Sequence, residues 1–382
     1  MKLLAIVGTR PEAIKMAPVL RLCAERQDIT SILAVTGQHP DLLGPSLAAS
    51  ATEPDFDLKV SAADCDPLGY VAAALPPILR LVQQTRPDRV IVQGDTASAM
   101  AGAEAASLCA LPLSHVEAGL RTHCERPWPE EPFRKAIDAL ADQLLAPTHD
   151  AAANLRAEGL RGAIHVTGNS GIDALLATIG SLERDPALGR ECDERLGLDD
   201  HRPIILVTLH RRENAGLGVA QLCAALRTIA ASVAADIVFP LHPNPLFGGP
   251  IRAELGDCAN VHLLSAQDPP AMVRLMQRCT LILTDSGGLQ EEAPSLGKPV
   301  LVLREETERP EGIDAGIAKL VGVQREAIIA GVIAFLRHPP AFPALNPYGD
   351  GRAAGRIVSA ILGEPYDPFP SPIPPSSAGG AS

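Results

Sequence analysis

The stretch KLLAIVGTRPEAIKMAP, residues 2–18, indicates the architecture of the chain. An unbroken apolar run ends in Gly-Thr-Arg at Arg10, and a charged segment with helix-forming residues follows at once. A strand-length apolar run without alternation is typical of a strand buried on both faces of a parallel sheet. The turn has neither G-x-G-x-x-G nor G-x-x-x-x-G-K-[ST]. It nevertheless combines a helix start with nearby cations, which are the parts of an anion site.

The same pattern recurs along the chain, with helix-like segments rich in Ala and Leu between the apolar runs. The first set of runs covers 2–8, 29–37, 88–95, 111–119, 143–148 and 163–169, and the second set covers 203–210, 236–242, 261–264, 281–285, 299–303 and 318–322. Alternating strands and helices predict an α/β fold. We expect two Rossmann-like doubly wound parallel-sheet domains that face each other across a cleft.

The two sets of runs predict the domain organisation. We expect an N-terminal Rossmann-like domain over 1–168 and a C-terminal Rossmann-like domain over 169–350. Residues 351–363 have the pattern of a last helix, which we expect to pack back on the N-terminal domain. Residues 364–382 are rich in Pro, Ser and Gly and predict a disordered tail.

Composition excludes several classes of protein. The chain has 382 residues, 46% of them hydrophobic, and a formal net charge of -12. Nucleic acids and anionic membranes bind basic faces, so we expect neither as a partner. The eight cysteines are dispersed without zinc-ligand spacing, which predicts reduced thiols and no metal. No apolar run has the length of a membrane span or a signal peptide, so we expect a cytoplasmic protein.

The segment LTDSGGLQEEAPSLGKPVLVL, residues 283–303, predicts a phosphate site. Ser286 is positioned to cap a helix, and the glycine pair after it would let backbone N–H groups approach an anion. Glu292, further along that helix, could accept hydrogen bonds from ribose hydroxyls. Pro294 must shorten or kink the helix. The alternative is a plain connection from strand to helix.

Arg10 and Lys15 offer positive charge to the same ligand from the first domain. Cations so placed would neutralise the charge of a departing diphosphate. The alternative is a surface ion pair with Glu12.

Three carboxylates follow predicted strands or lie in the adjoining loop: Asp95 in QGDTAS, Glu117 in HVEAG and Glu131 in PWPEE. Because ligands of parallel sheets bind beyond the carboxyl ends of the strands, these groups are candidates for proton transfer. His210 ends the run PIILVTLH and could hold a substrate hydroxyl or phosphate. Each carboxylate could instead be a helix cap or an ion-pair partner, and His210 could be a structural histidine.

Taken in order, these motifs resemble one family, the non-hydrolysing UDP-N-acetylglucosamine 2-epimerases. The matching segments are GTRPEAIKMAP, VTGQH, QGDTASAMAGAEAA, HVEAGLRT, PWPEE, VTGN, VTLHRREN, LHPNP and TDSGGLQEEAPSLGKPVLVLREETERPEG. The resemblance implies a fold of the GT-B type, a homodimer, and no metal or nicotinamide cofactor. It also implies elimination of UDP from the UDP-sugar and its re-addition through 2-acetamidoglucal.

The resemblance assigns residues to two groups. The catalytic group would be Asp95, Glu117, Glu131 and His210. The UDP-binding group would be Arg10, Lys15, His242, Ser286, Gly287, Gly288, Glu292 and Arg309.

Three departures from the family pattern bear on substrate and regulation. Asp41 and the acidic stretch near Asp64 stand where many members carry residues that bind a second UDP-GlcNAc as an activator, so we do not expect such activation. Phe133 replaces an asparagine, and VTGNS replaces VTGNT. The alternatives are a 2-epimerase of a modified UDP-sugar such as a 2,3-diacetamido uronic acid, a hydrolysing 2-epimerase, a GT-B glycosyltransferase, and an inactive sugar-nucleotide sensor.

Overall fold

The chain divides into two compact units. The computed structural model describes residues 1–38, 53–60, 66–124, 128–197 and 202–371. Unit 1 is Met1–Ala174 with Tyr348–Ser382, and unit 2 is Leu175–Pro347. The boundary therefore falls inside helix α7 (Ser170–Arg184), a few residues beyond the point where the sequence predicts the end of the first domain.

Unit 1 contains a seven-stranded parallel sheet in the order β3-β2-β1-β4-β5-β6-β7. Its strands are β1 (Lys2–Val7), β2 (Thr30–Val35), β3 (Phe56–Asp57), β4 (Arg89–Gln93), β5 (Leu113–Val116), β6 (Gln143–Ala146) and β7 (Ala163–Val166). All except β3 lie in predicted runs. Strand β3 is a two-residue edge strand and is too short to show a periodic pattern.

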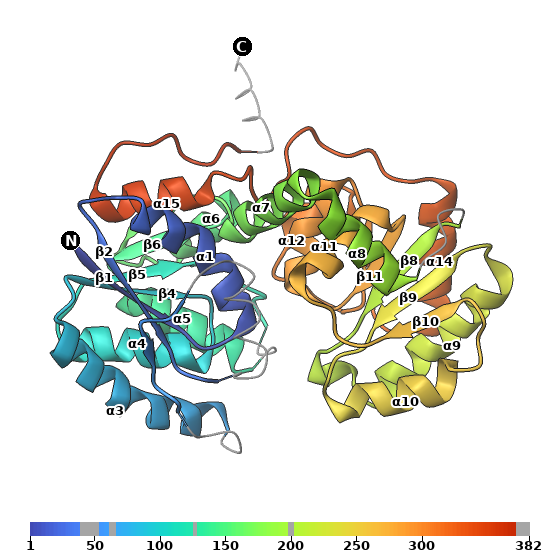
Figure 1. Cartoon of the computed structure of the whole chain (residues 1–382), viewed down its shortest axis with the longest axis horizontal. Coiled ribbons are helices and arrows are strands. Elements are labelled where there is room, and N and C mark those ends of the chain that lie inside the picture. The colour runs from blue at the N-terminus through green and yellow to red at the C-terminus, as the bar shows by residue number, and fades with distance from the viewer. Residues whose placement is uncertain (39–52, 61–65, 125–127, 198–201, 372–382) are drawn as a thin grey trace, which may run out of the picture. The chain divides into compact units, whose positions relative to one another are not determined.

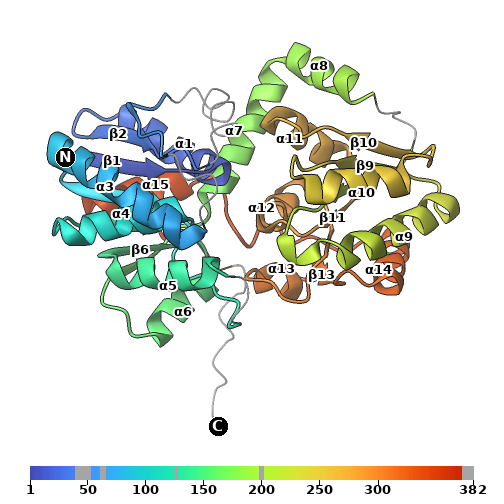
Figure 2. The ribbon, with the colours of Figure 1, turned by 90° about the horizontal axis from the view of Figure 1, so that it is seen from below.

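Helices cover both faces of this sheet (Figure 1). They are α1 (Arg10–Ala24), α3 (Pro67–Thr85), α4 (Ala97–Leu108), α5 (Glu130–Leu140), α6 (His149–Ala157) and α15 (Ala353–Leu362). Helices α1 and α15 pack together over one face, where their apolar residues form a single cluster with β1 and β2. Figure 2 shows α3, α4 and α5 in a row on the other face. The last helix thus completes a layer of unit 1, although the whole of unit 2 precedes it in the chain.

Unit 2 contains a six-stranded parallel sheet in the order β10-β9-β8-β11-β12-β13. Its strands are β8 (Ile204–Thr208), β9 (Asp236–Pro240), β10 (Val261–Leu264), β11 (Leu281–Thr284), β12 (Val300–Val302) and β13 (Ala318–Leu320). Its helices are α8 (Pro186–Leu196), α9 (Leu217–Ser232), α10 (Pro245–Leu255), α11 (Pro269–Arg278), α12 (Gly287–Glu292), α13 (Pro310–Asp314) and α14 (Arg325–Arg337), with 3₁₀ turns at Arg212–Asn214 and Ala293–Leu296.

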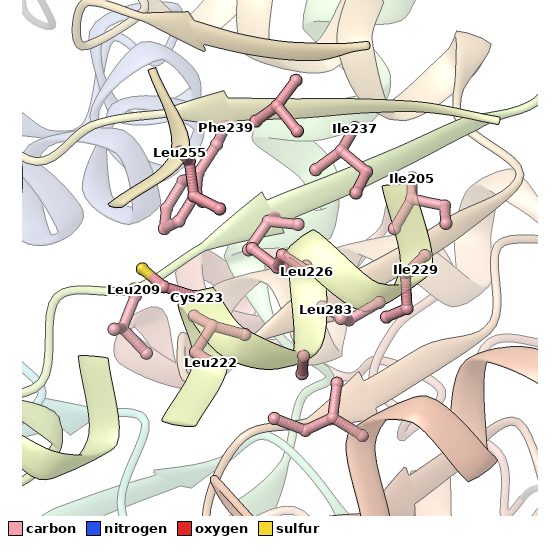
Figure 3. Close-up of a cluster of buried hydrophobic side chains, with 14 of the residues drawn as sticks. Ile205, Leu209, Leu222, Cys223, Leu226, Ile229, Ile237, Phe239, Leu255 and Leu283 are labelled. Carbon is pink, nitrogen blue, oxygen red and sulfur yellow. The ribbon is translucent and has the colours of Figure 1, made fainter. Parts of the chain in front are cut away.

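Strand β8 shows why the apolar runs do not alternate with polar residues. Ile205 and Val207 belong to the cluster under α9, α10 and α14, whereas Ile204 and Leu206 belong to the cluster under α8 and α11. Successive side chains of a strand point to opposite faces, so a sheet covered on both faces needs apolar residues at every position. Figure 3 shows the first of these clusters, with the side chains of β8, β9 and α9 packed together. The predicted α/β fold class, two doubly wound parallel sheets, is confirmed.

The prediction of a disordered tail from residue 364 is wrong for residues 364–371. Phe369 is 1% exposed, its backbone N–H donates to the Val166 carbonyl, and its ring lies 5.8 Å from the Arg356 guanidinium carbon. The hydroxyl of Tyr366 lies 2.7 Å from His165 Nδ1. Composition missed this segment because two aromatic anchors among prolines are enough to dock an extended chain. The rest of the predicted tail, residues 372–382, lies outside the described residues.

None of the helices in the described part of the chain has the length and apolar character needed to cross a membrane.

Candidate active site

The turn between β1 and α1 is closed by a buried carboxylate. Glu12 is 1% exposed and accepts hydrogen bonds from the backbone N–H groups of Gly8 and Thr9 and from the Thr9 hydroxyl. Its other oxygen accepts from the Thr96 hydroxyl, 2.7 Å away, at the start of α4. Glu12 therefore ties the turn that carries Arg10 to the turn after β4. A surface ion pair between Arg10 and Glu12, the alternative reading of the sequence, is excluded.

The Thr-x-x-Glu spacing of a capping box was the available sign that Glu12 closes this helix start. Burial raises the pKa of Glu12 to about 7, although the hydrogen bonds from Thr9, Thr96 and Gly8 act in the opposite direction. The carboxyl group at this turn therefore titrates near neutral pH.

Asp95 and Glu117 follow the neighbouring strands β4 and β5, and one arginine bridges them. Arg134 Nη2 lies 2.5 Å from Asp95 Oδ2 and 3.6 Å from Glu117 Oε1. Lys15 forms a further ion pair with Glu117. The structure thus brings together three of the predicted site residues, Asp95, Glu117 and Lys15, in one buried charge network of unit 1.

The backbone at these two strand ends is unusual. Gly94, just before Asp95, has φ +70°, and Glu117 has φ +69°. The left-handed region suits glycine, but it costs about 1–3 kcal/mol for a residue with a side chain, and such strain concentrates at functional sites. The conformation of Glu117 is therefore a second, independent indication that this edge of the sheet carries the chemistry.

Glu131 lies in the first turn of α5 and is almost fully buried. Its Oε2 accepts from the backbone N–H of Thr122 at 2.8 Å and from the Thr122 hydroxyl at 3.0 Å. Lys135, one turn later on α5, lies 3.4 Å from its other oxygen. The contacts of Glu131 thus join α5 to the loop after β5, and it lies one helical turn from Arg134.

The sequence interpretation did not select Arg134, the residue that bridges the carboxylates. A sign was present, because residues three apart on a helix share a face. Arg134 follows Glu131 at this spacing on α5, so a helix carrying one site residue presents the other beside it.

In unit 2, a buried aspartate organises the segment that carries His210. Asp285 accepts from the backbone N–H groups of His210 and Arg211 and from the Asn214 side chain, and it lies 3.0 Å from His210 Nδ1. Burial would raise the pKa of Asp285, but His210 and these backbone hydrogen bonds hold that pKa below its ordinary value. The ring of His210 stacks on that of His242 at 5.8 Å. Two predicted site residues of unit 2 thus lie side by side.

The glycine turn after β11 departs in part from its expected form. Ser286 occupies the N-cap position of α12, but its side chain accepts no capping hydrogen bond from the backbone of that helix. The expected effect of Pro294 is confirmed, because α12 ends at Glu292 and a 3₁₀ turn follows. The carboxylate of Glu292 lies near Gly288, since a Cβ built on that glycine would be 4.0 Å from Glu292 Oε1.

Arg309 lies beneath this turn, with 6% of its surface exposed. Its guanidinium donates to Glu291 at 2.9 Å and to Glu308 at 2.6 Å. A Cβ on Gly287 would lie 2.5 Å from Arg309 Cζ, well inside van der Waals contact. An alanine at position 287 would therefore force the ion-paired Arg309 guanidinium to move, and a direct contact of Arg309 with UDP stays a prediction.

Two further sequence predictions concern an activator site and a metal site. Asp41 and Asp64, the positions that argue against activation by a second UDP-GlcNAc, lie outside them. Within the described ranges, no group of three or more His, Cys, Asp or Glu side chains is arranged to hold a metal ion.

Comparison with known proteins identifies the family. A family model described as UDP-N-acetylglucosamine 2-epimerase matches residues 21–362. The chain belongs to the UDP-N-acetylglucosamine 2-epimerase family. It is 42% identical over 368 residues to the probable UDP-N-acetylglucosamine 2-epimerase of Ralstonia solanacearum, covering 94% of this chain and 98% of that protein. It is 41% identical over 369 residues to the UDP-N-acetylglucosamine 2-epimerase of Salmonella typhimurium, with the same two coverages.

A solved epimerase structure has the same fold. The UDP-GlcNAc 2-epimerase of Neisseria meningitidis bound to UDP-GlcNAc matches with a TM-score of 0.91 and 37% identity, over 95% of this chain and 100% of that chain. The predicted resemblance, the GT-B type of fold and the prediction of an isomerase are thereby confirmed.

Proposed function

We propose that the protein interconverts UDP-GlcNAc and UDP-ManNAc by eliminating UDP and adding it back through 2-acetamidoglucal. One observation carries the proposal: Asp95 and Glu117 emerge from adjacent strands and are bridged by Arg134. A 2-epimerase must remove a proton from one face of C2 and return one to the opposite face. Two carboxylates held in one network, with Glu131 one helical turn from their bridge, supply the groups for that exchange.

The second requirement is a stabilised leaving group. The C2 proton is weakly acidic, so its removal must be coupled to departure of UDP from C1. We propose that unit 2 binds the UDP through His242 and the turn 286–288, with Glu292 accepting from the ribose hydroxyls. His210, whose ring stacks on that of His242, stays in the catalytic group and would hold a substrate hydroxyl or phosphate. Arg10 and Lys15 of unit 1 would neutralise charge on the departing diphosphate. Arg309, which lies close to Gly287, would hold the backbone of this turn in place.

Proton NMR in D2O tests the proposal. UDP-GlcNAc incubated with the enzyme should lose its C2–H signal while UDP-ManNAc grows. Free ManNAc with UDP would identify a hydrolysing enzyme, and transfer of sugar to an added acceptor would identify a glycosyltransferase. Unchanged UDP-GlcNAc would refute the proposed substrate, and UDP-sugars with other groups at C2 and C3 would then be tried.

Variants test the assigned carboxylates. Asp95→Asn, Glu117→Gln and Glu131→Gln should each lower kcat about 10²- to 10⁴-fold, the range for loss of a general acid or base. Asp28→Asn is the matched control, since that carboxylate is exposed and paired with Arg26. Turnover at the unaltered rate in the Asp95 and Glu131 variants would refute the assignment.

We also propose that the enzyme works as a homodimer in the cytoplasm. The seven cysteines in the described part of the chain are free thiols, and four of them are buried, which suits a reducing compartment. Light scattering after size exclusion should give twice the 40.0 kDa chain mass. A mass of one chain at micromolar concentration would refute the dimer.

A further inference from the structure

His115 lies at the centre of a buried polar chain beneath the two candidate carboxylates. It belongs to β5, two residues before Glu117, and its side chain is fully buried. Nδ1 lies 2.7 Å from Asp138 Oδ1 on α5, and Nε2 lies 2.7 Å from the carbonyl oxygen of Gly94. The ring therefore connects α5 to the turn that carries Asp95.

Both partners of the imidazole are acceptors. A neutral ring has one N–H and one lone pair, so it would leave a lone pair facing an oxygen at 2.7 Å. A neutral ring with its hydrogen on Nε2 would be satisfied only if Asp138 were protonated and donated to Nδ1. However, its other oxygen accepts from Arg121 Nη2 at 2.8 Å and from the Gly119 N–H at 3.2 Å, which favours the carboxylate form.

The charges of the buried groups around His115 balance when His115 is a cation. Arg121 also forms a two-point pair with Glu158, at 2.7 Å for each contact. His115 and Arg121 then supply two positive charges, and Asp138 and Glu158 supply two negative charges. Burial would raise the pKa of Asp138, but His115 and Arg121 hold that pKa below its usual range. Buried charges are tolerated when they are paired and hydrogen-bonded in this way.

We infer that His115 is a positioning residue with hydrogen on both ring nitrogens, whose Nε2–H holds the Gly94 carbonyl and thereby aims the Asp95 carboxylate. Gly94 needs such a restraint, because glycine at φ +70° is free to leave this conformation once the contact is lost. Its backbone N–H also donates to the Val116 carbonyl at 3.0 Å, so a shift of the turn would reach the backbone just before Glu117. The role of Asp95 on which this inference depends is that of the proposed function.

The side chains of asparagine and glutamine separate the two contacts of the ring. The amide nitrogen of asparagine can occupy the place of Nδ1, and that of glutamine the place of Nε2. Both substitutions remove the charge, but only His115→Gln keeps a donor for the Gly94 carbonyl. We expect His115→Asn to lower kcat about 100-fold, as a displacement of about 1 Å can. We expect His115→Gln to lose less than about tenfold, and KM to change little in both variants.

These kinetics contradict the inference if the two variants lose kcat equally, or if the loss falls on KM alone. Far-UV circular dichroism checks that both variants are folded. A merely structural role for the ring would give no preference for glutamine over asparagine.

The protonation state is tested on the unmodified enzyme, independently of turnover. In ¹⁵N-histidine-labelled protein, the signals assigned to His115 by their absence in His115→Gln should show hydrogen on both ring nitrogens at the pH of the kinetic assays. A spectrum with one unprotonated nitrogen overturns the inference. If the wild-type enzyme fails to epimerise UDP-GlcNAc, the proposed function fails, and this measurement still decides the state of His115.

Discussion

Replacing Glu12 with glutamine tests whether burial of this carboxyl group, in the turn after β1, makes the stability of the protein depend on pH. The amide oxygen of the new side chain can keep the contacts with the Gly8 and Thr9 N–H groups, and its amide nitrogen can donate to the Thr96 hydroxyl, whereas Glu12 accepts from it. The substitution therefore removes the titrating group while leaving the geometry in place.

The magnitude follows from the pKa of Glu12. Its value is about 7 in the folded protein against 4.5 for the unperturbed group. Between these values the folded state keeps a proton that the unfolded state has lost, so the stability of the wild-type protein falls as pH rises. At about 1.4 kcal/mol per pKa unit, the loss reaches about 3 kcal/mol above pH 7.

Urea unfolding at a series of pH values, followed by far-UV circular dichroism, measures the effect. Trp128, the only tryptophan of the chain, is 58% exposed in the folded protein, so its fluorescence is not used as the reporter. The free energy of unfolding of Glu12→Gln minus that of the wild type should be near its minimum at pH 4.5 and should rise by about 3 kcal/mol by pH 8. Other titrating groups cancel in this difference. A difference that stays constant over this range would refute the reasoning.

Three further predictions concern other parts of the fold. Arg134→Lys should lower kcat for epimerisation about 10- to 100-fold, because the shorter lysine side chain cannot place its ammonium group where Arg134 Nη2 contacts both Asp95 and Glu117; a turnover equal to that of the wild type would contradict the bridge. Gly287→Ala should lower the melting temperature, since its Cβ would lie 2.5 Å from Arg309 Cζ, whereas Gly288→Ala, with its nearest atom at 3.9 Å, is the matched control and should melt higher than Gly287→Ala. Phe369→Ala should cost about 3–5 kcal/mol in urea unfolding and Phe369→Leu clearly less; equal stability of the alanine variant and the wild type would show that this segment contributes nothing.

Some of the site could be predicted because its signs are local in the chain. The glycines and Pro294 of the turn after β11 are neighbours in sequence. Asp95 and Glu117 each come directly after an apolar run that predicts a strand. The residues that organise these groups are distant from them. Lys15 and Glu117 are separated by 102 positions, and His115 and Asp138 by 23. No periodicity reports such pairs, because they depend on which strands lie side by side.

By itself, the sequence determined the α/β class, twelve of the strands, and the motifs that mark the family. Those features follow from local patterns, since burial on both faces demands continuous apolar runs and turns demand particular residues. Only the tertiary structure decided that Glu12 is buried, that Arg134 spans Asp95 and Glu117, and that Phe369 docks on unit 1. The order of strands in the sheet brings these side chains together, and the free energy of burying or pairing each one depends on neighbours that lie far away in the chain.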